Sequence, residues 1–338
     1  MRNYIFNEKI SLKPNKITKF NEVCYTSDAD DLVHSIHEGC TRINAVKQFH
    51  RFQISPAAKR NITEKVNWLY LLGKSRYMKT YSGKEIFNFK INFLTLTLPS
   101  MQQHPTAQIT SECFNQFLTE IRQRVKMENY IWRLEFQRNG NVHYHIVTDC
   151  FIDYFLAQKI WNRIVNKLGY VDAYTAKFSK MSLQEYIENS SAAAGTPFDV
   201  QAKRYAKGKA CSWKEPRSVD VKVCTSDASI AYYISKYFSK EKDNNTLCNR
   251  FDNEENSFSL RLWFCSRSLS KLKSICDYSC QMPINWHTLL KGKLKVRNIV
   301  LDYADCLFFE LREMSNEIKS LLYPIYRKYA NELQYNSA

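Results

Sequence analysis

The stretch from Tyr130 to Asp149, YIWRLEFQRNGNVHYHIVTD, constrains the fold more than any other part of the sequence. Two runs rich in β-branched and aromatic residues flank a polar turn at Arg138–Asn141. Asn139-Gly140 within that turn is a strong hairpin signal, because both residue types accept a positive φ. We therefore predict two antiparallel strands joined by a short turn, with side chains of one strand lying beside those of the other.

Further strand and helix patterns lie on both sides of this hairpin. Ser55 and Pro56 are typical of a helix start, and the pattern predicts a helix over residues 55–79. Further strands are expected at 87–99, 171–178, 218–224 and 258–267, and further helices at 106–128, 152–168, 182–189, 228–240 and over most of 284–338, broken at Pro324. Because hairpin-connected strands alternate with helices, we predict an α+β fold, in which helices flank an antiparallel β-sheet.

The charge balance indicates a polyanionic partner. The chain has 49 Lys and Arg against 33 Asp and Glu, a net charge of +16. Basic side chains that neutralise phosphates release counterions, and the 21 Tyr and 20 Phe could stack on unpaired bases. The composition therefore favours a nucleic-acid-binding protein.

The sequence gives no sign of a membrane protein or a secreted protein. No stretch reaches the roughly 18 apolar residues that a membrane-spanning helix needs. Residues 1–13 lack the apolar segment of a secretory signal, and the 11 cysteines contain no CxxC pair. We expect a cytoplasmic protein with reduced thiols and no membrane partner.

His143 and His145 are the sharpest chemical signal. Residues two apart on a strand point to the same side, so both imidazoles would project together and could hold one divalent cation. Glu135, on the preceding strand of the hairpin, could add a carboxylate, and Gln137 is the alternative oxygen donor. The hairpin register decides between these two residues. Two imidazoles and one oxygen suit Mg²⁺ or Mn²⁺ and leave room for a phosphate oxygen.

A second cluster lies in the segment YISKYFSK, residues 233–240. Tyr233 and Tyr237 are four apart and share one helix face, and Lys236 and Lys240 share an adjoining face. A phenol oxygen can attack a phosphodiester, and nearby ammonium groups stabilise the charge that develops on phosphate. The bland alternative places both tyrosines in an apolar stripe with Ile230 and Ile234.

A third element is the alternating strand FLTLTL at residues 93–98, which by itself predicts only a central strand. A basic stretch, QAKRYAKGKACSWKEPR, occupies residues 201–217 in a segment, 190–216, that we expect to be a loop. Its candidate DNA-binding residues are Lys203, Arg204, Lys207, Lys209 and Trp213. The alternative is a soluble insertion without a partner.

Taken in this order, FLTLTL, NGNVHYH (139–145) and YISKYFSK resemble the three motifs of rolling-circle replication initiators of the HUH endonuclease superfamily. The sequence looks most like the replication proteins of microviruses, the small single-stranded DNA phages. RLWFCSRSL, residues 261–269, also resembles the strand that follows the tyrosine helix in phage members. The resemblance covers roughly residues 85–270.

The resemblance implies an RRM-like HUH core with additions at both ends. Residues 85–270 would be the catalytic domain, residues 1–84 a partly helical N-terminal extension, and residues 271–338 a mostly helical C-terminal extension. It implies that His143, His145 and Glu135 hold Mg²⁺ or Mn²⁺, and that Tyr233 or Tyr237 is the nucleophile, with Lys236 and Lys240 beside it.

The resemblance also implies the reaction and its partners. The enzyme would nick single-stranded or hairpin origin DNA, form a 5′-phosphotyrosine and later rejoin the strands. It would act in the cytoplasm of a host bacterium with the host polymerase and helicase, since the chain has no GxxxxGK[ST] loop of its own. Two alternatives stay open: a relaxase or transposase of the same superfamily, or a single-stranded nucleic-acid-binding protein without catalysis.

Overall fold

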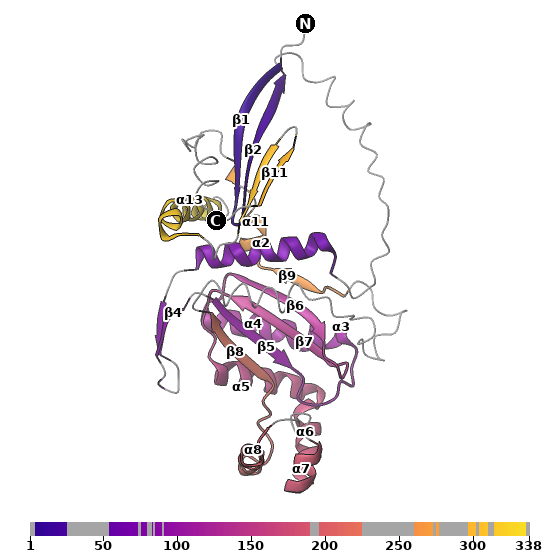
Figure 1. Ribbon diagram of the computed structural model, residues 1–338. Coiled ribbons are helices and arrows are strands. Elements are labelled where there is room, and N and C mark those ends of the chain that lie inside the picture. Colours follow the sequence, from indigo (N-terminus) through magenta and orange to yellow (C-terminus); the bar gives the residue numbers. More distant parts are fainter. Residues whose placement is uncertain are drawn as a thin grey trace. The chain divides into compact units, whose positions relative to one another are not determined.

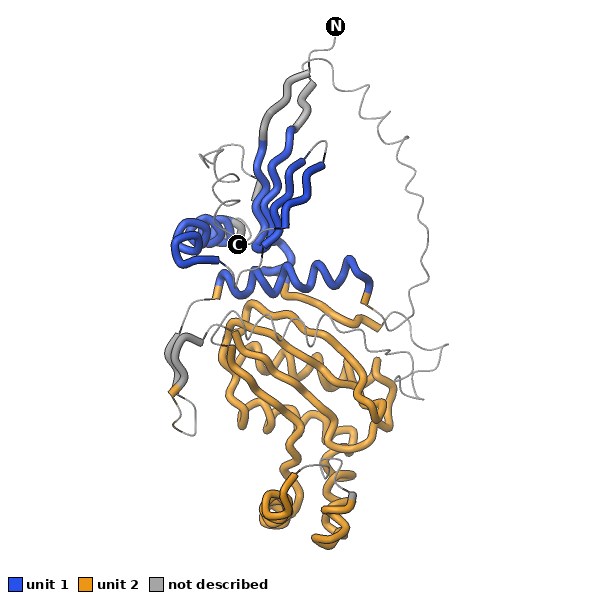
Figure 2. Tube along the Cα trace, in the orientation of Figure 1, with its two compact units in different colours: residues 1–50, 55–72, 267–338 blue, residues 51–54, 73–266 orange. Residues whose placement is uncertain are grey.

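The computed structural model of the protein divides the chain into two compact units (Figures 1 and 2). Unit 1 comprises residues 1–50, 55–72 and 267–338, and unit 2 comprises residues 51–54 and 73–266. The structure describes residues 4–25, 54–73, 76–79, 83, 85–89, 91–189, 196–224, 260–272, 275–276, 297–301, 304–309 and 314–335. No helix among these residues is both long enough and apolar enough to cross a membrane.

Unit 1 builds one antiparallel sheet from both ends of the chain, in the strand order β10-β1-β2-β12-β11. Its strands are β1 (Tyr4–Lys13), β2 (Lys16–Tyr25), β10 (Ile275–Cys276), β11 (Arg297–Leu301) and β12 (Ala304–Phe308). Its helices are α2 (Pro56–Leu72), α11 (Arg267–Lys271) and α13 (Asn316–Tyr335). Trp68 of α2 meets Tyr326 of α13 edge to face, at a centroid distance of 5.3 Å. The terminal segments thus share a sheet and a core.

Two expectations for these terminal segments need correction. The tail was expected to be largely helical, but residues 297–308 contain the two strands β11 and β12. Pro324 was expected to break the helix, yet α13 continues through it. Pro324 and Ser320, whose carbonyl loses its usual N–H partner, both lie on the exposed side of the helix, where water can bind that carbonyl. The predicted helix 55–79 ends at Leu72, directly before Gly73, and residues 76–79 form β3.

Unit 2 contains a five-stranded antiparallel sheet in the order β8-β5-β7-β6-β9. Its strands are β5 (Ile91–Thr97), β6 (Tyr130–Phe136), β7 (Val142–Thr148), β8 (Val219–Cys224) and β9 (Trp263–Cys265), and β3 (Arg76–Lys79) pairs separately with β4 (Glu85–Phe89). The predicted hairpin, β6 and β7, is confirmed, as is the α+β class with antiparallel sheets and flanking helices. The last predicted strand, 258–267, shortens to the three residues of β9 among those described.

Helices cover one face of this sheet (Figure 1). They are the continuous run α3 (Thr106–Gln108), η1 (Ile109–Phe114) and α4 (Asn115–Val125), followed by α5 (Tyr154–Val165). Phe114 stacks on Tyr144 of β7 at a centroid distance of 4.1 Å, and the indole of Trp161 donates a 2.8 Å hydrogen bond to the carbonyl of Thr97. The predicted helices 106–128 and 152–168 are thereby confirmed, and the apolar side of the sheet is assigned to the core.

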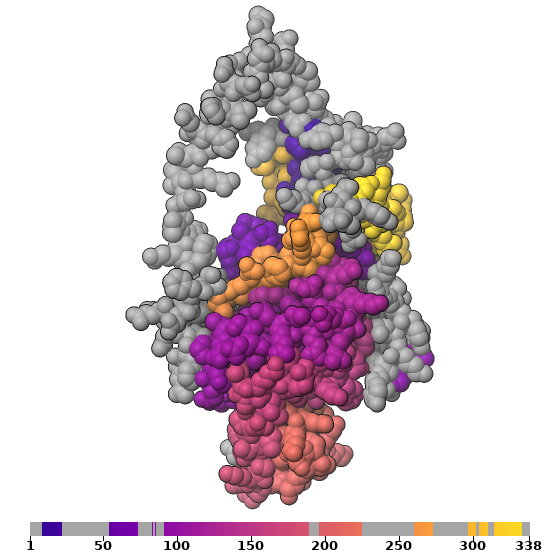
Figure 3. All heavy atoms as spheres, turned by 180° about the vertical axis from the view of Figure 1, so that it is seen from behind, coloured from indigo at the N-terminus to yellow at the C-terminus, as the bar shows by residue number. Residues whose placement is uncertain are grey.

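A helical lobe, α6–α8, extends from one end of unit 2, as two opposite views show (Figures 1 and 3). It consists of α6 (Tyr170–Ser179), α7 (Leu183–Asn189), which was expected, and α8 (Phe198–Ala210). Residues 171–178 were predicted to form a strand, but they are helical. Tyr170, Tyr174 and Phe178 recur every four residues, and the tilted ring contact of Tyr174 with Phe178 lies along the helix. The alternation of Val171, Ala173 and Thr175 suggested a strand, but helical packing decides the conformation.

The second correction in the lobe concerns the predicted loop 190–216. Residues 198–210 of this segment form helix α8, which starts directly after Pro197. Tyr205 of this helix packs against Trp213, at a centroid distance of 5.6 Å, and its hydroxyl donates a 2.7 Å bond to the carbonyl of Met181. Polarity suggested a loop, whereas a single buried aromatic ring per turn is enough to hold a helix whose other side is basic and solvated.

Candidate metal centre

Three central strands place the candidate metal ligands on the sheet face opposite the helical core. On β7, Tyr144 and Ile146 point into the core, so the alternating His143 and His145 point to the other side. The same alternation sends Glu135 of β6 to that side, since Leu134 and Phe136 belong to the core. The two-residue period expected from the sequence therefore holds.

The strand register brings these side chains together. Glu135 is the direct cross-strand partner of His143, and Arg133 is the partner of His145. On the other side of β7, Thr95 and Thr97 of β5 are the partners of His145 and His143. Each histidine therefore lies between a residue of β6 and a threonine of β5.

Gln137, the alternative oxygen donor, lies beyond the end of β6. Its backbone N–H donates to the carbonyl of Asn141, and its carbonyl accepts from Gly140, so it forms part of the hairpin turn. Gly140 has a φ of 82°, as the Asn-Gly signal predicted. The register therefore favours Glu135 over Gln137 as the third member of the group.

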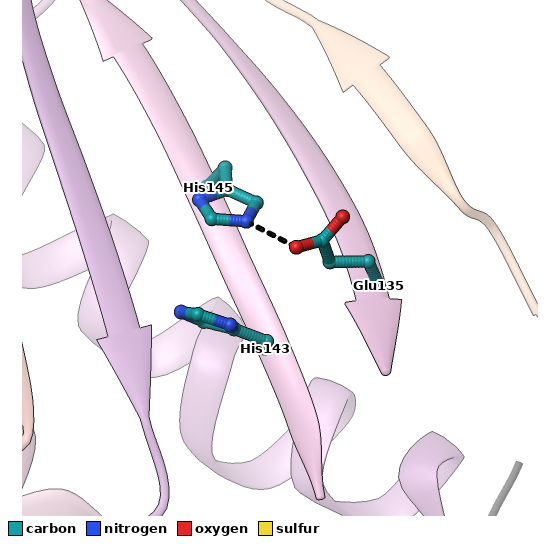
Figure 4. A group of neighbouring side chains, drawn as sticks. All are labelled: Glu135, His143 and His145. Carbon is teal, nitrogen blue, oxygen red and sulfur yellow. Dashed lines mark hydrogen bonds and ion pairs between the residues drawn. The ribbon is translucent and has the colours of Figure 1, made fainter. Parts of the chain in front are cut away.

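Glu135, His143 and His145 form a compact group (Figure 4). Nε2 of His145 lies 2.8 Å from Oε1 of Glu135, and the two imidazole centroids are 4.5 Å apart. One ligand atom from each of the three residues lies within 4.8 Å of the others. Three donors from two adjacent strands thus converge without any change of backbone.

The spacing fits a small hard cation. Two adjacent ligands of an octahedral ion, each about 2.1 Å from it, are about 3 Å apart. The separation of 2.8 Å between His145 and Glu135 is close to that value. The limit of 4.8 Å on all three pairs is also compatible with binding of a single ion after small side-chain adjustments. The group can therefore hold Mg²⁺ or Mn²⁺ and leave coordination positions for other ligands.

Burial sets the electrostatics of the group. His145 is 1% exposed and Glu135 is 5% exposed, whereas His143 is only half-buried. Buried charges interact more strongly than exposed ones, because little water screens them. A ligand that joins the group would reach it from the side of His143.

Arg133 places a positive charge next to the group, a feature that sequence reasoning missed. It lies two residues before Glu135 on the same face and is 4% exposed. Burial lowers the pKa of the Arg133 guanidinium, and the charge of Glu135 opposes that shift. The available signal was its two-residue spacing from Glu135, which puts both on one face.

A network of amide side chains fixes the end of the hairpin next to His143. Asn141 Oδ1 accepts a 2.9 Å bond from the backbone N–H of Gln102, and Asn141 Nδ2 donates to the carbonyl of Ser100. In return, Gln102 Oε1 accepts from the N–H of Val142 at 2.8 Å. The loop that follows β5 is thereby attached to the start of β7, directly before the first histidine.

The predicted tyrosine cluster lies outside the described residues. Tyr233, Tyr237, Lys236 and Lys240 all fall between 225 and 259, so their relation to the histidines stays a prediction.

The predicted basic residues lie on α8 and divide into two groups. Lys203, Arg204, Lys207 and Lys209 are exposed. Trp213, expected to contact DNA, is instead 4% exposed, and Phe178 stacks on it at a centroid distance of 5.2 Å. A ring enclosed in this way has no face left for a base, so Trp213 supports the lobe from within.

Gly208 is a second residue whose role sequence reasoning missed. A Cβ atom at this position would lie 2.2 Å from the Trp213 ring, so only glycine allows the indole to approach the helix. Trp213 itself has a φ of 58°, which folds the chain back onto α8.

The comparisons with known proteins agree with the placement of the candidate site. Neither the curated proteins nor the solved structures include a match to this chain. Residues 91–242 match the family described as replication-associated protein ORF2, and this span contains β5 to β8 with Glu135, His143 and His145. The match supports a rolling-circle replication initiator family for this chain and, with it, a role in DNA replication.

Proposed function

We propose that the protein is a metal-dependent nickase that starts rolling-circle replication through a tyrosine nucleophile. The observation that carries the proposal is the Glu135, His143 and His145 group on the sheet of unit 2. This group lies inside the span that matches replication-associated proteins. The same span includes Tyr233 and Tyr237 in the sequence. We extend the resemblance to microvirus replication proteins and to the HUH superfamily on the same grounds.

The ligand set suits the proposed chemistry. Mg²⁺ or Mn²⁺ held by His143, His145 and Glu135 would supply Lewis-acid polarisation of the scissile phosphate. The half-buried His143 marks the side from which a phosphate would approach. Arg133 adds a positive charge that favours an anion beside the group.

The chain's own nucleophile would carry the bond exchange. The phenol oxygen of Tyr233 or Tyr237 attacks phosphorus, and the bond from phosphorus to the 3′ oxygen breaks. The phenol proton passes to solvent and the departing 3′ oxygen takes up a proton, so one phosphodiester replaces another. The products are a 5′-phosphotyrosine and a free 3′ hydroxyl, which a host polymerase would extend. Lys236 and Lys240 would offset the negative charge that develops on the phosphate.

The basic side of α8 would hold the DNA strand outside the reaction centre. Lys203, Arg204, Lys207 and Lys209 are exposed on one helix whose position is fixed by the packing of Tyr205 and Trp213. Exposed cations of this kind bind phosphates without reading the sequence.

The test is covalent capture. The protein is incubated with labelled single-stranded DNA of its own genome and Mn²⁺ and analysed on a denaturing gel. We expect a labelled protein–DNA adduct, with the modified peptide containing residue 233 or 237. Tyr233→Phe combined with Tyr237→Phe should abolish the adduct and leave DNA binding within about twofold, because a phenol oxygen is lost but no charge changes. An adduct that persists in the double variant would refute the proposed nucleophile.

The same experiment separates the alternatives. Binding of single strands without cleavage, equal with Mn²⁺ and with EDTA, would point to a binding protein that lacks catalysis. Cleavage that depends on Mn²⁺ but yields no adduct would point to hydrolysis without strand transfer. Both results would contradict the proposal.

A further inference from the structure

The two threonines of β5 contact the two candidate metal ligands. Oγ1 of Thr95 lies 3.1 Å from Nδ1 of His145. Oγ1 of Thr97 lies 3.4 Å from Nε2 of His143. In each case the hydroxyl engages one ring nitrogen and leaves the other to face the remaining members of the group.

We propose that Thr95 and Thr97 are positioning residues that choose which nitrogen of each histidine binds the metal. Coordination would use Nε2 of His145 and Nδ1 of His143. This inference rests on the proposed metal centre and deepens it, since it assigns a role to the paired threonines that a strand pattern alone does not give.

The chemistry of a neutral imidazole supports this assignment. Such a ring carries a proton on one nitrogen and a lone pair on the other, and a metal takes the lone pair. The nitrogen that faces a threonine then carries the proton and donates it to Oγ1. Nε2 of His145, the nitrogen left over, is the one that lies 2.8 Å from Glu135. Both observations on His145 therefore agree on the same coordinating atom.

The sheet makes the threonines rigid partners. β5 is hydrogen-bonded to β8 on one side and to β7 on the other, so its backbone is fixed along both edges. Each threonine is the direct cross-strand partner of the histidine that it contacts, because Thr95 pairs with His145 and Thr97 pairs with His143. β-Branched side chains also have few χ1 rotamers, so each hydroxyl stays close to its ring.

The two contacts differ in length, and so should their effects. At 3.1 Å the Thr95 contact is an ordinary hydrogen bond, whereas 3.4 Å for Thr97 is near the limit of one. Partners that orient a metal-binding histidine typically change metal affinity by about 10- to 100-fold. We expect Thr95→Val to lie within this range and Thr97→Val to have the smaller effect.

The main test measures Mn²⁺ affinity of the full chain by the electron paramagnetic resonance signal of free Mn²⁺. Valine keeps the branched shape and the strand preference of threonine but removes the hydroxyl. Thr95→Val should weaken Mn²⁺ binding at least about tenfold, and Thr95→Ser should restore most of it. Thr110→Val is the matched control. It removes a 2.8 Å contact with the hydroxyl of Tyr144, which lies between the two histidines but points to the opposite face. We expect the control to bind Mn²⁺ like the wild type.

A second measurement tests the choice of nitrogen directly. Ring ¹⁵N resonances of the Zn²⁺-loaded protein report which nitrogen of each histidine carries the proton. We expect His145 to be protonated at Nδ1 and His143 at Nε2. The same protonated nitrogen in both rings would overturn the inference, whether or not a valine variant folds.

The outcomes distinguish this inference from the function on which it rests. If the wild-type chain binds no Mn²⁺, the proposed metal centre itself fails. If the wild type binds Mn²⁺ and Thr95→Val binds it equally well, the metal centre stands and the positioning role is rejected.

Discussion

Oε1 of Glu135 lies 2.8 Å from Nε2 of His145, although the two residues are ten positions apart in the chain. The contact crosses from β6 to β7 diagonally, because the direct partner of Glu135 is His143. One carboxylate thus reaches both histidines. This geometry separates Glu135 from Gln137, and it leads to the first prediction.

Glu135→Gln should abolish Mn²⁺-dependent cleavage, whereas Gln137→Ala should retain it. The first change removes the negative charge from the metal-binding group, and the second alters a residue of the hairpin turn. We expect a loss of more than about 100-fold in the rate of nicking for Glu135→Gln and for His143→Ala, measured with an origin oligonucleotide in Mn²⁺ buffer. A loss of the same size in Gln137→Ala would mean that the register argument assigns the wrong oxygen donor.

Replacing two lysines of α8 should weaken binding of single-stranded DNA and reduce its salt dependence. Lys203 and Lys207 lie one turn apart on the helix and are both exposed. Loss of two phosphate contacts should lower the slope of log affinity against log salt by about 1.4 for single strands. Fluorescence anisotropy over a salt series would measure this slope.

Lys328→Ala is a suitable control for the lysine variants. Lys328 of α13 is exposed and lies 3.9 Å from Glu332 one turn later, as Lys203 lies 3.7 Å from Asp199 one turn earlier. An equal reduction in slope for Lys328→Ala would show a general charge effect and would remove the reason to assign α8 to DNA.

Gly208→Ala should destabilise the helical lobe. The added methyl group would overlap the Trp213 ring at 2.2 Å, so the ring or the helix has to move. Overpacking of this kind costs about 1–3 kcal/mol. Thermal unfolding followed by tryptophan fluorescence would detect the loss, and Ala206→Ser, at an exposed position of the same helix, is the neutral control. A Gly208→Ala protein as stable as the wild type would contradict the packing described for Trp213.

The lobe should also lose stability at alkaline pH. Burial raises the pKa of Tyr174 from 10.0 to about 12. Between these values the unfolded chain has lost the phenol proton and the folded chain keeps it, so the free energy of unfolding falls as pH rises. The stabilising contribution is complete below pH 10 and is lost as pH rises toward about 12.

Tyr174→Phe removes this titration. Melting temperatures of the wild type and the variant, compared at pH 8 and again near pH 11, should show a difference that shifts in favour of the variant at the higher pH. A difference that does not change with pH would contradict the assigned burial of the phenol.

The sequence by itself determined the hairpin of β6 and β7, because strand periodicity and the Asn-Gly turn are local signals that tertiary contacts did not have to override. That hairpin alone puts Glu135, His143 and His145 on one face. Local patterns failed where distant packing decided the outcome. α6 read as a strand and α8 as a loop until Phe178, Tyr205 and Trp213 are seen to share one aromatic cluster.

Only the tertiary structure decided how the group is supported. The register of β5 against β7 depends on residues some fifty positions apart, and it brings Thr95 to His145 and Thr97 to His143. The same dependence on distant pairing explains why the tail, expected to be helical, supplies β11 and β12 to a sheet that begins at Tyr4. A strand pairing of this kind is fixed by partners elsewhere in the chain, and no local window of sequence contains them.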